Sequence, residues 1–114
     1  MAWLKEFSGM KVLEINNGRV KKFSGEIIYV IEDNKVKDFY GKILYFIDGE
    51  KIKKFSGEVI LYFDGEWLKR YSGMRMYQVS DNKIKEFSGM IKYVIDGFLA
   101  RVELMGLLAI LYAS

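Results

Sequence analysis

The chain contains no cysteine, no histidine and no proline. Without cysteine it can form neither a disulfide framework nor a thiolate nucleophile. Without histidine it lacks the commonest general base of enzymes, and the sequence shows no P-loop, no Rossmann glycine pattern and no metal-ligand spacing. We therefore expect no enzyme activity, no cofactor and no metal site. The absence of cysteine fits a reducing compartment, so we expect a cytoplasmic protein.

Long apolar runs are also absent. The most apolar segment, Leu104–Ala113, has ten residues, whereas a transmembrane helix needs about 20. Residues Met1 to Glu6 show no basic stretch followed by an apolar run, so we expect neither a signal peptide nor a transmembrane protein. The formal net charge is only +3, which permits an anionic partner without requiring one.

An aromatic-Ser-Gly signature recurs every 16 residues without insertion or deletion. Phe39-Tyr40-Gly41 occupies one place of the series, and the other five places are Phe7-Ser8-Gly9, Phe23-Ser24-Gly25, Phe55-Ser56-Gly57, Tyr71-Ser72-Gly73 and Phe87-Ser88-Gly89. Halfway through each unit lies a second turn signal, such as Asp48-Gly49 or Asn16-Asn17-Gly18. Two turns in each 16-residue unit leave strands of about six residues, rich in Ile, Val, Tyr and Phe.

These signals predict an all-β fold of six 16-residue hairpin repeats in a single domain spanning 1–114, with its strands in 1–97. Twelve strands follow, in an antiparallel up-and-down order. If both turns have two residues, Tyr45 faces Ile52, and this register makes one face apolar in every unit. The other face carries a row of lysines, named here the basic belt: Lys5, Lys21, Lys37, Lys53, Lys69 and Lys85. The strands that carry this row hold seven further basic residues: Arg19, Lys22, Lys35, Lys51, Lys54, Arg70 and Lys83.

The hydrophobic C-terminal segment, 98–114, breaks the repeat. Leu, Met and Ala favour a helix that is apolar all round and must be buried, although Gly106 weakens it. A thirteenth strand from Leu107 to Tyr112 is the alternative. Twelve strands close into a barrel of about 12 Å radius, whose hole matches a helix about 10–12 Å across. We therefore predict a closed twelve-stranded barrel with this helix plugging its interior.

Removal of the plug supplies a first test. A chain that ends at Gly97 loses the apolar side chains that fill the barrel, and we expect it to be insoluble or unfolded. Its solubility, circular dichroism and thermal unfolding report the outcome. A soluble monomer that unfolds cooperatively would contradict the plug.

Departures from the repeat are the candidate binding residues. Trp67, Arg75 and Lys92 break it in the fourth, fifth and sixth units, and the basic residues Lys69 and Arg70 stand beside Trp67 in the sequence. We predict that they form one patch on adjacent strands for an anionic ligand, with Arg75 on the core face at the barrel mouth. The aspartates of the second turn signal are attributed to turn formation rather than to a cation site.

Twelve antiparallel strands followed by the Leu104–Ala113 segment resemble the tubby-like superfamily, which includes the LURP-one-related proteins and the phospholipid scramblases. The hairpin unit Ile43–Gly49 also resembles small bacterial beta-flower repeat proteins. The resemblance covers the architecture of the whole chain and rests on no specific motif. It implies a helix threaded through the barrel and an affinity for phosphoinositides or anionic membranes.

The residues and the resemblance together predict a non-enzymatic binding or scaffold module that contacts anionic phospholipid at a membrane periphery through its basic belt. The alternative is a structural protein that self-associates through an apolar outer face made of Phe23, Ile28, Phe55, Ile60 and Tyr62. Only charge supports a nucleic-acid partner, so we do not expect one.

Overall fold

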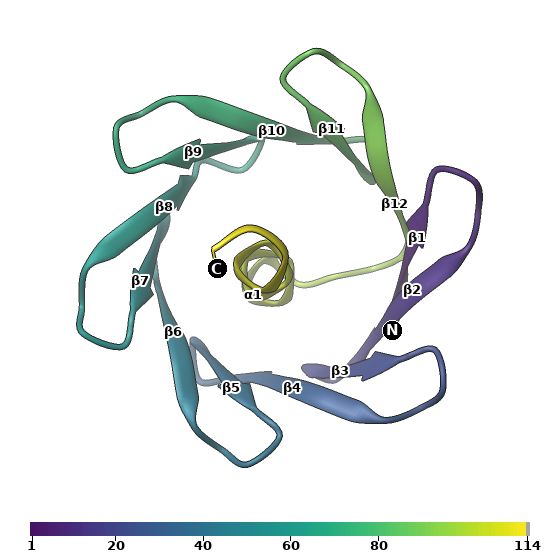
Figure 1. Ribbon diagram of the computed structural model, residues 1–114, viewed down its shortest axis with the longest axis horizontal. Coiled ribbons are helices and arrows are strands. Elements are labelled where there is room, and N and C mark those ends of the chain that lie inside the picture. Colours follow the sequence, from purple (N-terminus) through teal and green to yellow (C-terminus); the bar gives the residue numbers. More distant parts are fainter. Residues whose placement is uncertain (114) are drawn as a thin grey trace.

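The computed structural model describes residues 1–113, and its strands form one closed barrel. Each strand pairs antiparallel with its neighbours in the chain, and the first strand pairs with the last. Hairpin loops splay outward from the ring, and one helix lies at its centre (Figure 1). The predicted twelve-stranded up-and-down barrel is therefore confirmed. Ser114, the last residue of the predicted segment 98–114, lies outside the described residues.

Lysine-bearing strands alternate with apolar strands along the chain. The lysine-bearing strands are β1 (Ala2–Glu6), β3 (Arg19–Lys22), β5 (Lys35–Asp38), β7 (Lys51–Lys54), β9 (Trp67–Arg70) and β11 (Lys83–Glu86). The apolar strands are β2 (Lys11–Asn16), β4 (Ile27–Glu32), β6 (Ile43–Asp48), β8 (Val59–Phe63), β10 (Arg75–Ser80) and β12 (Ile91–Gly97). The barrel measures 36 × 35 Å across and 20 Å along its short direction, so it is a wide, shallow ring.

The predicted register is wrong by two residues in the hairpins that close at the Asp/Asn-Gly turns. Ile52 lies opposite Ile47, and Tyr45 lies opposite Lys54. The turn of this hairpin consists of Gly49 and Glu50, with Gly49 at a φ of +60°, rather than of the residues Asp48-Gly49. Because side chains alternate with a period of two, a two-residue error leaves the predicted core face unchanged.

The aromatic-Ser-Gly turns have three residues, and an extra residue follows each of them. In the first, Gly9 donates its N–H to the Glu6 carbonyl and Glu6 donates to the Met10 carbonyl, at 2.9 and 2.8 Å. The pairing then shifts between Lys5 and Leu4, so that Val12 forms a bulge. The same shift recurs where β4, β6, β8, β10 and β12 each pair with the lysine-bearing strand that precedes them in the chain.

This bulge corrects two predictions about which face a residue occupies. Arg75 lies opposite Lys69 and is exposed on the outer side of the barrel, not on the core face. Ile28 and Ile60, predicted on the outer face, occupy the bulge position and pack against the core. An extra residue reverses the alternation of side chains, which a uniform register could not show.

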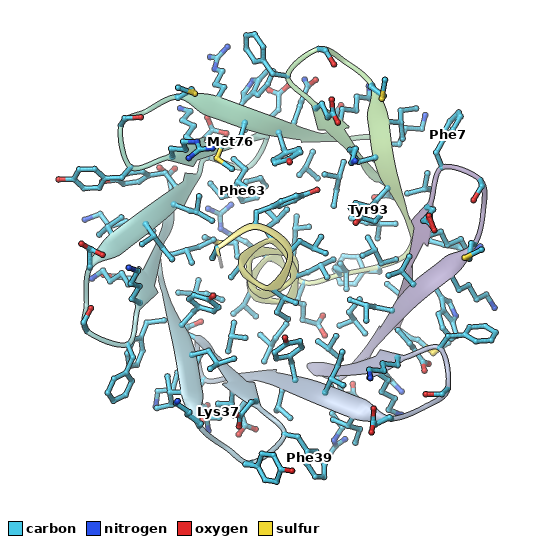
Figure 2. The ribbon with its side chains drawn as sticks, in the orientation of Figure 1. Phe7, Lys37, Phe39, Phe63, Met76 and Tyr93 are labelled. Carbon is cyan, nitrogen blue, oxygen red and sulfur yellow. The ribbon has the colours of Figure 1, made fainter. Side chains whose placement is uncertain are left out.

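The core is built in rings of equivalent residues. One residue from each lysine-bearing strand has no solvent exposure at all: Leu4, Val20, Val36, Ile52, Leu68 and Ile84. Phe63 and Tyr93 also lie inside the barrel, while Lys37 lies on its outside (Figure 2). The C-terminal segment contributes Met105, Leu107, Leu108 and Ala109, each at most 1% exposed.

The C-terminal segment is a helix, so the alternative of a thirteenth strand is wrong. Helix α1 spans Arg101–Tyr112 and begins three residues before the predicted apolar run. Glu103 fixes its first turn, because one carboxylate oxygen accepts the N–H of Ala100 at 3.0 Å and the other accepts the N–H of Gly18 at 2.9 Å. The start of the helix is thereby bound to the turn between β2 and β3.

Packing explains why a glycine stands at position 106, although glycine weakens the helix prediction. A Cβ atom built on Gly106 would lie 2.6 Å from Cδ1 and 2.9 Å from Cγ1 of Ile31. Ile31 is only 4% exposed, so its side chain has little room to move away. The glycine therefore allows the helix to approach β4 closely.

Gly106→Ala is expected to destabilise the protein. The overpacking costs about 1–3 kcal/mol, which exceeds the gain in helix propensity of about 1 kcal/mol. Ile31→Val removes Cδ1, so the two substitutions together should destabilise by less than the sum of their separate effects. Denaturant unfolding of all three variants measures this coupling, and a Gly106→Ala variant more stable than the wild type would contradict it.

Candidate functional site

The two ends of the barrel differ in chemistry because each kind of turn lies at its own end. In an up-and-down barrel the turns that follow the lysine-bearing strands all lie at one end, and those that follow the apolar strands lie at the other. The first end bears the six aromatic side chains named here the crown: Phe7, Phe23, Phe39, Phe55, Tyr71 and Phe87.

The crown side chains are largely in solvent, with exposed fractions between 62% and 70%. Phe7 and Phe39 project from the outward tips of their loops (Figure 2). Tyr40, Met10, Met74 and Met90 in the same turns are also exposed. Most of the large exposed hydrophobic side chains therefore gather at one end, whereas scattered single ones would need no explanation.

The charges at the crown end are balanced in the first four turns, and the sixth contains a single carboxylate, Glu86. Lys22 and Lys54 pair with Glu26 and Glu58, each at 3.2 Å. The fifth turn instead contains two arginines, Arg70 and Arg75, and no carboxylate. These two arginines give the crown end a small basic excess on one side of the ring.

The opposite end is acidic. Its turns and the strand ends that flank them hold four basic side chains, Arg19, Lys35, Lys51 and Lys83, against eight carboxylates, Glu32, Asp33, Asp48, Glu50, Asp64, Glu66, Asp81 and Asp96. Asp33 and Asp81 adopt φ values of +53° and +54°, which fits their predicted role in turn formation. Among residues 1–113, no group of three or more acidic side chains is placed to hold a metal ion.

The basic belt lies on the outside of the barrel, but most of its charge is compensated. Four of its six lysines pair with carboxylates at the acidic end: Lys5 with Asp96, Lys37 with Glu32, Lys53 with Asp48 and Lys69 with Asp64, at 2.7 to 3.2 Å. Where Lys21 and Lys85 stand, the equivalent partner positions hold Asn16 and Ser80. The belt is therefore weaker as a binding surface than its lysine count indicates.

Three of the five predicted patch residues lie together. Trp67 and Lys69 on β9 face the outside beside Arg75 on β10, and the Arg75 guanidinium lies 4.7 Å from the centre of the Trp67 ring. Phe87 of the crown adds a second ring 6.2 Å from Trp67. The Trp67 indole already stabilises the positive charge of Arg75, so this guanidinium gains less from an added anion.

The other two predicted residues do not join Trp67 and Lys69, although Arg70 lines one surface pocket with Arg75, Glu86 and Phe87. Arg70 pairs in register with the buried Leu61, which places it on the inner side of the barrel mouth. Lys92 stands on β12, separated from β10 by β11, and its Nζ lies 3.8 Å from Glu86. Lys92 occupies the bulge position that Val12, Ile28 and Ile60 fill elsewhere, so it cannot join a patch on β9 and β10.

Sequence reasoning missed the crown as a site. The aromatic-Ser-Gly signature was interpreted as turn chemistry, which explains the glycine but not the aromatic residue. A three-residue turn places that side chain beyond the last ladder pair, where most of its surface stays exposed. An aromatic residue retained at all six turns was the available signal.

No family model, curated protein or solved structure matches this chain. Within residues 1–113, no helix has the length and apolar character needed to cross a bilayer.

Asp64 has the most strongly shifted carboxylate at the acidic end. The N–H groups of Trp67 and Glu66 donate to it at 2.7 and 2.9 Å, and the Lys69 ammonium lies at 3.2 Å. These hydrogen bonds, with that of Trp67 the largest, lower the pKa of Asp64 from 3.8 to about 2. The charged form of Asp64 therefore stabilises the turn that begins at residue 64.

The low pKa of Asp64 predicts a pH-dependent loss of stability. A pKa lower in the folded state contributes stability that is present above the unfolded value and lost as pH falls between about 4 and 2. The stability difference between the wild type and Asp64→Asn should therefore be largest near neutral pH and shrink over that range. Denaturant midpoints at several pH values measure it. Asp81→Asn, in another acidic turn, is the control, and a difference independent of pH would contradict the assignment.

Proposed function

We propose that this chain is a non-enzymatic module that docks crown-first on anionic membrane surfaces. The observation that carries the proposal is the crown itself, a ring of six exposed aromatic side chains at one end of a wide, shallow barrel. Tyr favours the membrane–water interface, and Phe is common on protein surfaces that enter the boundary between headgroups and acyl chains. A ring of loop tips can contact a flat surface at several points at once, which strengthens weak individual contacts.

Charge supports the same orientation. The fifth turn supplies the arginines Arg70 and Arg75 at the crown end, while the opposite end carries eight carboxylates. A negatively charged membrane therefore attracts the fifth turn of the crown end, and it is attracted less to the acidic end, where carboxylates outnumber the basic side chains. The basic belt, mostly paired with those carboxylates, contributes less to the contact than the sequence predicted.

The resemblance to the tubby-like superfamily and to beta-flower proteins is a hypothesis that agrees with this proposal. A cytoplasmic protein would meet the anionic leaflet that such docking needs. The self-assembling alternative is supported by the same crown, whose apolar side chains could pack against a second copy. Of its predicted residues, Phe23 and Phe55 remain exposed, whereas Ile28 and Ile60 pack against the core.

Vesicle co-sedimentation tests the docking. The wild type should bind phosphatidylserine-containing vesicles at low salt, more weakly at high salt, and phosphatidylcholine vesicles least. Phe7→Ser combined with Phe23→Ser should lower the affinity at least about tenfold, because two apolar side chains no longer enter the interface. Both residues are about 70% exposed, so the thermal midpoint should change little.

Phe98→Ser is the matched control, because Phe98 is 77% exposed and follows β12 at the acidic end. It should bind as the wild type does. Light scattering separates the alternative: a monomer supports docking, and a defined oligomer that the crown substitutions dissociate supports self-assembly. Equal binding by the crown variant and the wild type would overturn the proposed face.

A further inference from the structure

A cavity of about 530 Å³ opens at the crown end, between the end of α1 and the wall formed by β8, β9 and β10. Its volume lies within the range of about 300–1,000 Å³ usual for small-molecule sites. Ile60, Leu61 and Met76 supply apolar lining from the barrel wall, and Tyr112 and Ala113 supply it from the helix end. Figure 2 shows Met76 at this wall.

The position of the helix explains why the cavity lies on this side. Helix α1 approaches β4, β5 and β6 most closely, and Gly106 allows its contact with Ile31. Towards the other wall the space is filled by large side chains, among them Tyr112, whose ring stacks on Tyr77 with 3.9 Å between centroids. Beyond this stacked pair, at the mouth, the filling ends and the cavity begins.

Arg70 provides the polar end of the cavity. It lines the hollow from the inner side of the mouth, where Lys22 and Lys54 occupy the equivalent positions of other units. Those lysines pair with Glu26 and Glu58, four residues later in their turns. Met74 stands at that place after Arg70, and no carboxylate of residues 1–113 forms an ion pair with its guanidinium.

We propose that this cavity binds a single-chain amphiphile with an anionic head. The carboxylate or phosphate of the head accepts hydrogen bonds from the Arg70 guanidinium, and the alkyl chain lies along Ile60, Leu61 and Met76. An uncompensated guanidinium beside an apolar hollow suits this chemistry, because it offers fixed donors to an anion and leaves the chain out of water. Tyr71 of the crown also lines the cavity, whereas Phe7 and Phe23 do not, so substitutions at Phe7 and Phe23 separate membrane docking from the cavity site.

Calorimetric titration with monomeric alkyl compounds, kept below the concentration at which they form micelles, tests the site. Decanoate should bind, octanoate about tenfold more weakly, and decanol about 10- to 100-fold more weakly than decanoate. The dependence on chain length reports burial of the alkyl chain, and the comparison with the alcohol reports the anionic head. No binding of decanoate would overturn the proposal.

Arg70→Gln should reduce decanoate affinity to about that of decanol and leave decanol binding unchanged. Lys54→Gln is the matched control at the equivalent position and should bind decanoate as the wild type does. Equal loss in both variants, or none in Arg70→Gln, would overturn the site.

The same Arg70→Gln variant on phosphatidylserine vesicles identifies the source of the amphiphile. Arg75→Gln removes the same charge from the turn but does not line the cavity, so it is the control. An equal loss of vesicle binding in the two variants assigns the cavity to a free amphiphile, and a larger loss in Arg70→Gln assigns it to a lipid drawn from the bilayer. The crown variant Phe7→Ser/Phe23→Ser should still bind decanoate. Failure of docking and failure of the cavity site are therefore distinguishable.

Discussion

The interior of the barrel must be filled, and the rest of the structure depends on how α1 fills it. A barrel of twelve strands is too wide for its own side chains to meet at the centre. The chain supplies the missing volume with Met105, Leu107, Leu108 and Ala109, which lose all or nearly all contact with solvent. Burial of these side chains stabilises the wall and the helix together, since neither element covers its apolar surface alone.

The repeated sequence places the same chemistry at equivalent points around the ring, which suits a broad contact better than a single pocket. Aromatic side chains at all six outward turns produce an annular surface, and lysine–carboxylate pairs recur on the outer wall. A specific site requires a break in this regularity. The fifth unit provides one, because Arg70 and Arg75 stand in a turn that has no carboxylate.

Much of the fold could be predicted because the 16-residue spacing fixes strand number, direction and order. The register could not be predicted, because the sequence Asp48-Gly49 does not show whether Asp48 belongs to the strand or to the turn. The bulges were hidden for a related reason: a three-residue turn leaves no mark on the hydrophobic pattern except an extra apolar residue such as Val12. In the fifth unit the extra residue is Met76, and this bulge places Arg75 on the outside instead of the predicted core face.

The candidate site could be predicted only in part. Trp67, Lys69 and Arg75 do meet on one outer surface, because adjacent strands bring breaks in neighbouring units together. Arg70 turns inward toward the mouth and shares a pocket with Arg75 but not with Trp67 or Lys69, and β11 separates Lys92 from all three. The cavity beside Arg70 depends on the lateral position of α1, which is set by the fit of Gly106 against Ile31 and by no local pattern.

The central helix also limits how such a chain can evolve. Genes built from tandem copies gain and lose units readily, and open solenoids tolerate this because each unit contacts only its neighbours. Here the gain of a seventh unit would widen the ring around a helix of unchanged diameter, and the loss of one unit would narrow the ring. The number of units and the size of the helix can therefore change only together. Substitutions in the turns are tolerated more easily, because they leave the circumference of the ring unchanged.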